Sequence, residues 1–102
     1  MGVRGKKRLP PIHPGGVLRE ILGEAGLSVN ALALSLRVPA NRIGAVVKGE
    51  RGITADTALR LARYFGTSAQ MWMNLQAKYE LDAAQDMLRN RIEREVLPRP
   101  AA

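Results

Sequence analysis

The chain has no cysteine, a single histidine (His13) and few aromatic side chains, which make up 4% of its 102 residues. Without thiols it can form neither disulfides nor thiolate zinc sites, and the absence of cysteine is compatible with a reducing compartment. One histidine cannot build a metal-ligand cluster. We therefore expect no metal and no cofactor, and a core made mainly of Leu, Ile, Val and Ala.

Long apolar runs are also missing. No segment approaches the ~20 residues of a membrane span, and the N-terminal "MGVRGKKRLPP" lacks the apolar stretch of a secretory signal. We expect a cytoplasmic protein with no membrane partner. Catalytic patterns are absent as well. His13 precedes Pro14 at a helix start, which favours a capping role, and "HPGGVLRE" lacks the spacing of a phosphate-binding loop. We expect no enzyme.

Positive charge is abundant and unevenly placed. The net charge is +7, of which residues 1–9 carry +4. Residues 10–67 hold seven cations and four anions, whereas residues 68–102 hold five of each. The excess on the N-terminal two-thirds favours a polyanionic partner, although charge alone also fits a role in solubility.

Five segments have apolar residues at helical spacing, and none shows the strict alternation of a strand. Pro14 suits a first helical turn, and the third segment is expected to run from Ala40 to Val47. Leu59 is expected to face inward from the fourth. The signals at the segment ends are Ser28, Thr54 and Ser68 as N-caps and Gly26 and Gly66 as stops. The sequence predicts an all-α fold of five helices.

The second and third helices are joined by about three residues, so they must cross steeply and share a small core. The spacing of the residues that would form this core matches the helix-turn-helix of DNA-binding proteins, with an ordinary helical corner as the alternative. The matching residues are Leu32, Ala33, Leu36, Val38, Ile43 and Val46. Arg37 is the exception, because the turn favours glycine there. We expect a slightly different turn that avoids a left-handed arginine.

If the motif is real, the third helix enters the major groove with its N-terminal turn against the bases. Our candidate base contacts are Ala40, Asn41, Arg42 and Ala45. Asparagine pairs bidentately with adenine, arginine does so with guanine, and alanine packs on thymine methyls. Our candidate phosphate contacts are Asn30, Lys48 and Arg51. Asn41 could instead make a local helix-start bond, and the two cations could simply be solvated.

The C-terminal third carries two apolar stripes. Trp72, Leu75 and Tyr79 form the first, and Leu81 begins a second stripe that continues through residues 84, 88 and 92. The second stripe needs a covering surface, which a partner chain or a fold-back of the helix could supply. A separate sixth helix near the C-terminus is one interpretation of the rotated face.

Several segments together resemble the HigA/VapI antitoxins, a Cro/C1-type (XRE) helix-turn-helix family. They are "IHPGGVLREIL", "GLSVNALALSL", "VPANRI", "KGERGITADTALRLARYFGTS" and "MWMNLQAKYEL". The similarity spans residues 12–81. On this basis we divide the chain into a flexible basic arm (1–11), a DNA-binding core (12–67), a C-terminal helical dimerisation region (68–97) and a tail (98–102).

The resemblance implies a homodimer that represses its own operon by binding an inverted repeat of double-stranded operator DNA, and that neutralises a HigB-like, mRNA-cleaving RelE-type toxin. It places the dimer interface in the C-terminal region, where our candidates are Trp72, Leu75, Tyr79 and Leu81. Helical spacing alone favours core over interface for Trp72 and Tyr79. A stand-alone XRE regulator without a toxin is the main alternative, and a protein-only interaction module is the other.

Overall fold

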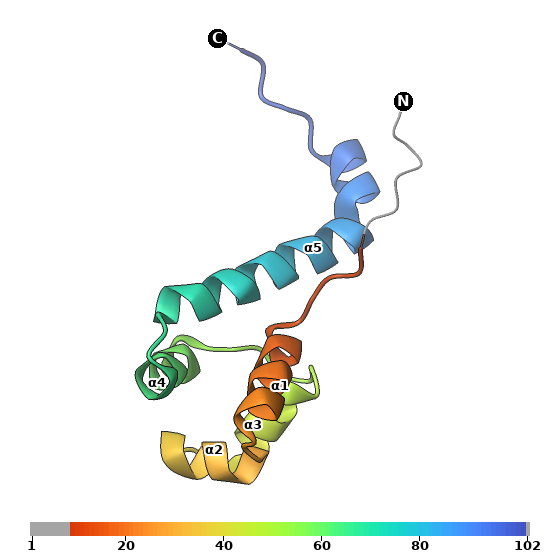
Figure 1. Ribbon diagram of the computed structural model, residues 1–102. Helices are drawn as coiled ribbons and strands as arrows, with labels where there is room; N and C mark the ends of the chain where they lie inside the picture. The colour runs from red at the N-terminus through yellow and green to blue at the C-terminus, as the bar shows by residue number, and fades with distance from the viewer. Residues whose placement is uncertain (1–8, 102) are drawn as a thin grey trace.

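The computed structural model describes residues 9–101, which form five helices and, within that range, no strand (Figure 1). The helices are α1 (Pro14–Ala25), α2 (Val29–Leu36), α3 (Ala40–Val47), α4 (Ala55–Phe65) and α5 (Ala69–Glu95). The all-α, five-helix prediction is confirmed. Most of the expected basic arm and the last residue of the tail lie outside the described residues.

Short side chains fix where the helices begin. Ser28 Oγ accepts a hydrogen bond from the third amide of its helix at 3.0 Å, and Ser68 Oγ does the same at 3.0 Å. Thr54 caps α4 in the same way. His13 caps α1, because its Nδ1 accepts the Gly15 N–H at 2.9 Å. These bonds satisfy amides that have no partner inside the helix, and they confirm the predicted caps.

The core lies between α1, α2, α3, α4 and the first half of α5. Its fully or nearly fully buried members are Leu18, Leu22, Leu32, Ala33, Leu36, Ile43, Val46, Ile53, Ala58, Leu61 and Trp72. α1 crosses α3 so closely that a Cβ at Gly15 would overlap the backbone carbonyl of Val46. Glycine is therefore required at this crossing, which holds α3 against the body of the molecule.

Leu59 does not face inward as expected, since its side chain is 63% exposed. The buried residues of α4 are Thr57, Ala58 and Leu61. At 3.6 residues per turn, Leu59 lies about 100° around the helix from Ala58 and roughly 160° from Leu61. A short helix that buries one stripe must leave that position outside.

Trp72 is a core residue, with 0% of its surface exposed. Its indole N–H donates to Thr67 Oγ1 at 3.1 Å, so the polar end of the ring is satisfied inside one chain. A side chain without accessible surface offers nothing to a partner. The assignment of Trp72 to a dimer interface is therefore wrong.

α5 continues without a break to Glu95, so the separate sixth helix is also wrong. Neither glycine nor proline occurs between residues 69 and 95, and ion pairs four residues apart, such as Lys78 with Asp82 at 2.9 Å, support its exposed face. Leu81 is 63% exposed and Ile92 is 49% exposed. Figure 1 shows the last turns of α5 standing clear of the other four helices.

Candidate DNA-binding surface

α2 and α3 form the steep corner expected of a helix-turn-helix. Leu32 and Leu36 of α2 and Ile43 and Val46 of α3 are buried against each other and the rest of the core, and Val38 packs on the core between the two helices. The apolar face of α3 is thus fully used. The opposite face of α3 is accessible to solvent and to a binding partner.

The turn is made by Arg37 itself, which adopts left-handed backbone angles of φ 62° and ψ 44°. The expectation of a different turn is wrong. The Val38 N–H bonds to the Ala33 carbonyl at 3.1 Å, so a six-residue backbone loop closes the end of α2. The ends of α1 and α4 close in the same way, with Gly26 at φ 68° and Gly66 at φ 73° in the position that Arg37 takes here.

The outward face of α3 is short and made of small residues. Ala40 and Asn41 in the first turn are exposed, and Gly44 and Ala45 one turn later are partly exposed. A Cβ at Gly44 would meet only the Val29 side chain, at 4.0 Å. Nothing inside the fold demands glycine at this position. The residues proposed to meet bases thus lie together on one accessible strip, except Arg42.

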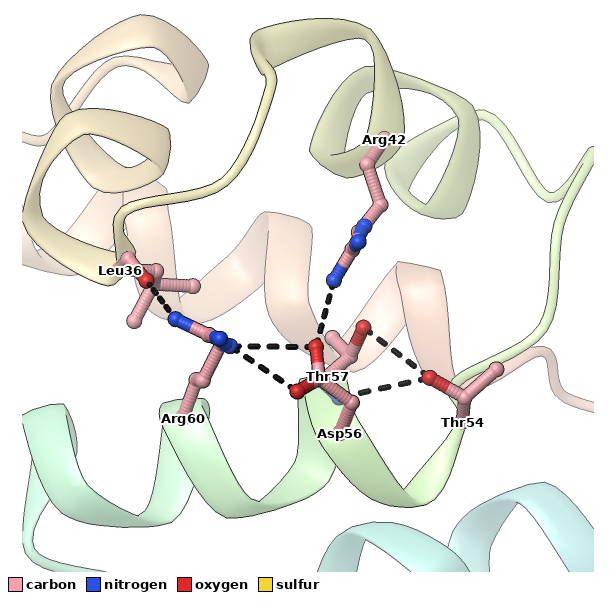
Figure 2. A network of polar contacts seen from close by, with 6 residues as sticks. All are labelled: Leu36, Arg42, Thr54, Asp56, Thr57 and Arg60. Carbon is pink, nitrogen blue, oxygen red and sulfur yellow. Dashed lines mark hydrogen bonds and ion pairs between the residues drawn. The ribbon is translucent and has the colours of Figure 1, made fainter.

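Arg42 points toward α4 and is engaged there (Figure 2). Its Nη1 lies 2.7 Å from Asp56 Oδ2, and its side chain is 26% exposed. Arg60 binds the same carboxylate through Nε at 3.1 Å and donates from Nη1 to the Leu36 carbonyl at 2.9 Å. One carboxylate and two guanidinium groups thereby connect the end of α2, the start of α3 and the first turn of α4.

The hydrogen bonds from Arg42 and then Arg60 hold the pKa of Asp56 below its usual 3.8. Asp56 also lies in the first turn of α4, where the helix dipole favours a negative charge. Sequence reasoning missed this network. The four-residue spacing of Asp56 and Arg60 was a signal that could have indicated their pairing, but nothing local indicated Arg42. The role of Arg42 as a base contact stays a prediction, and it requires the guanidinium to leave or share Asp56.

The candidate phosphate contacts surround α3. Asn30 lies in the first turn of α2, Lys48 follows α3, and Arg51 lies in the loop before α4, and all three are exposed. That loop is anchored from α5, because the buried Gln76 accepts the Ile53 N–H through Oε1 at 2.7 Å. The positions of these side chains are compatible with a shared polyanion, and their contacts stay predictions.

A family model described as helix-turn-helix matches residues 18–72. Virulence-associated protein I of Dichelobacter nodosus is 55% identical over 82 residues, which are 79% of this chain and 76% of that protein. An addiction module antidote protein of the HigA family from Coxiella burnetii has the same fold, with a TM-score of 0.86 and 48% identity, over 89% of this chain and all of that one. The chain belongs to the HigA/VapI family of helix-turn-helix antitoxins.

Solved relatives of this chain are described together with DNA. One of them is the Pseudomonas aeruginosa antitoxin HigA with the higBA promoter, which is 50% identical and has a TM-score of 0.84 over 86% of this chain and 97% of that one. This similarity confirms the predicted fold class, with its helix-turn-helix and C-terminal helix. Further relatives are described as HTH-type transcriptional regulators and as antitoxins.

The remaining candidates of this HigA/VapI chain lie along α5. Leu75 and Tyr79 are partly buried and Leu81 is exposed, so their place in an interface stays a prediction. The Tyr79 ring meets the His13 ring edge-on, with centroids 4.7 Å apart, which ties α5 to the start of α1. Within residues 9–101 no group of acidic and imidazole side chains could hold a metal ion, and no helix there is long and apolar enough to cross a bilayer.

Proposed function

We propose that this protein is a DNA-binding antitoxin that represses its own promoter. The observation that supports this most directly is the outward strip of α3, where Ala40 and Asn41 stand exposed in the first turn. In helix-turn-helix proteins that turn contacts base edges. The HigA relative described with its promoter supports DNA binding by a chain of this fold.

Asn41 is the polar side chain of this strip whose amide is available for bidentate pairing with adenine. Lys48, Arg51 and Asn30 bind phosphates around it in our proposal. Arg42 keeps α3 oriented through Asp56 and reaches DNA only if its guanidinium leaves or shares that carboxylate. Sequence is then read mainly by Asn41 and by the small residues Ala40 and Ala45, which permit close approach to the groove.

The test is a titration of the protein with its own promoter fragment and with a scrambled fragment, followed by fluorescence anisotropy. We expect Asn41→Ala to weaken promoter binding by roughly 5- to 150-fold for each half-site that loses its bidentate base contact, and to leave binding to the scrambled fragment unchanged. Asn74→Ala, an exposed amide on α5, is the matched control, and sedimentation checks that this variant keeps the parent's oligomeric state. Equal loss on both fragments, or no loss, would reject α3 as the reading element.

We further propose that the protein acts as a homodimer and neutralises a HigB-like toxin. Two copies present two α3 helices to successive major-groove segments of an inverted repeat. The exposed apolar residues of α5, including Leu81 and Ile92, support the region 68–97 as the contact between copies. Sedimentation should give twice the chain mass, and Leu81→Asp should shift it toward the monomer.

Toxin neutralisation has its own test. The proposal requires a RelE-type toxin gene beside this one. Expression of that gene should arrest growth, and co-expression of this chain should restore it. A regulator without a toxin would bind the promoter and fail to restore growth, so this experiment separates the two functions.

A further inference from the structure

Arg37 has a left-handed backbone conformation, which glycine adopts in the corresponding turns after α1 and α4. It is the one non-glycine residue with positive φ in the part of the chain that the structure describes, at φ 62°. The equivalent turns after α1 and α4 use Gly26 and Gly66 and are closed by the same six-residue backbone hydrogen bond. A left-handed arginine is strained where glycine is not. An observed outlier of this kind is a reason to look for a function.

The fold itself does not account for the arginine. Its backbone N–H closes the turn, which any residue could do. The carbonyl of Leu36, which a cation at the end of α2 could bind, is already bonded by Arg60. The Arg37 side chain is exposed and makes no hydrogen bond or ion pair with residues 9–101. Its charge is therefore available to a partner.

The position of Arg37 indicates what that partner is. It precedes Ala40, the first residue of α3, by three positions, so it stands beside the end of α3 that enters the groove. Phosphates line the groove on both sides of an inserted helix, and arginine is well suited to bind them. We propose that Arg37 contacts a DNA phosphate beside the N-terminal turn of α3. The proposal rests on the proposed DNA-binding function and extends it to a residue outside the helices.

The alternative is a purely structural role, in which the cation favours the negative end of the α2 dipole. The two readings predict different behaviour for Arg37→Gly, which relieves the strain and removes the charge. A phosphate contact predicts weaker DNA binding with a thermal midpoint equal to or above that of the parent chain. A dipole role predicts unchanged DNA binding at every salt concentration. The midpoint alone does not separate the two roles, because the relief of backbone strain opposes the loss of the dipole interaction.

The experiment measures binding of the full chain to its own promoter fragment between 50 and 200 mM NaCl. For a dimer that loses one contact per protomer, we expect the slope of log affinity against log salt to become shallower by about 1.8. Affinity at low salt should fall roughly tenfold or more. Arg37→Lys should keep the parent slope. Arg37→Asn, which tolerates a left-handed backbone without a charge, should behave like Arg37→Gly.

The matched control is Arg99→Gly, which removes the same charge from the segment after α5, at the end of the molecule far from α3 (Figure 1). Its slope should equal that of the parent. If Arg37→Gly and Arg37→Asn bind with the parent's affinity and slope while Asn41→Ala does not, this inference fails and the proposed function stands. If the parent chain itself does not bind its promoter, both fail.

Discussion

Substitution of Gly44 tests directly how much free space lies beside α3. A Cβ at this position meets only Val29 Cγ1, at the ordinary contact distance of 4.0 Å. Replacing a helix-interior glycine with alanine stabilises the helix by about 0.8–1.0 kcal/mol when nothing collides. For a chain of this size that corresponds to a rise of about 4–8 °C in the thermal midpoint. Gly44→Ala should therefore be more stable than the parent.

Gly15→Ala makes the same chemical change at a place with no room. The added methyl would overlap the Val46 carbonyl where α1 crosses α3, so backbone must move. Overpacking of this kind typically destabilises by about 1–3 kcal/mol. The two variants should thus move in opposite directions in thermal melts followed by circular dichroism at one fixed protein concentration, since dimerisation makes the midpoint concentration-dependent.

Promoter binding by Gly44→Ala tests whether the glycine permits α3 to approach the bases closely. If α3 sits deep in the groove, the added methyl should weaken promoter binding even though the protein is more stable. A drop in the thermal midpoint of Gly44→Ala would refute the space described beside Gly44. A rise in that of Gly15→Ala would refute the overlap described at Gly15. Unchanged promoter affinity in a stabilised Gly44→Ala would refute the close approach of α3 to the bases.

Other predictions test the supports of the site. Gln76→Leu leaves the buried Ile53 N–H without its acceptor and should cost about 1–3 kcal/mol in urea denaturation. Because the folded pKa of Asp56 lies below 3.8, its ionised form stabilises the fold above that pH, and this contribution is lost as pH falls below it. Asp56→Asn should remove that part of the acid sensitivity in urea midpoints measured between roughly pH 5 and pH 3. Ser28→Ala should destabilise by about 1 kcal/mol through loss of the α2 cap, without affecting the slope of the salt dependence. Trp72, the single tryptophan, should emit at short wavelength and resist acrylamide quenching until the chain unfolds.

The features that could be predicted from the sequence are local ones. A serine or threonine just before an apolar helical pattern predicts where a helix begins, and a glycine just after such a pattern predicts where it ends. The spacing of the apolar residues from Leu32 to Val46 predicts how two successive helices pack. The caps, the bounds of α3 and the helix-turn-helix core followed from them. The exposed position of Asn41 is predictable for the same reason, because apolar residues occupy the opposite face of α3.

The features that could not be predicted depend on contacts between distant segments. Whether Leu59 or Phe65 completes the stripe of α4 depends on how α5 crosses it. The pairing of Arg42 with Asp56 joins residues 14 apart whose helices must first be packed. Steric preference predicts that Arg37 avoids a positive φ. That preference depends only on the local backbone, so it carries no information on why the protein accepts the strain.

The bond between Gln76 and the Ile53 amide sets a limit on how this protein can be recombined. The loop between α4 and α5, near residue 67, is the simplest place to join the DNA-reading half of one member to the assembly half of another. A junction there would separate Trp72 from the core it fills and Gln76 from the loop it holds. The exchange point therefore belongs C-terminal to Tyr79, where α5 leaves the rest of the molecule.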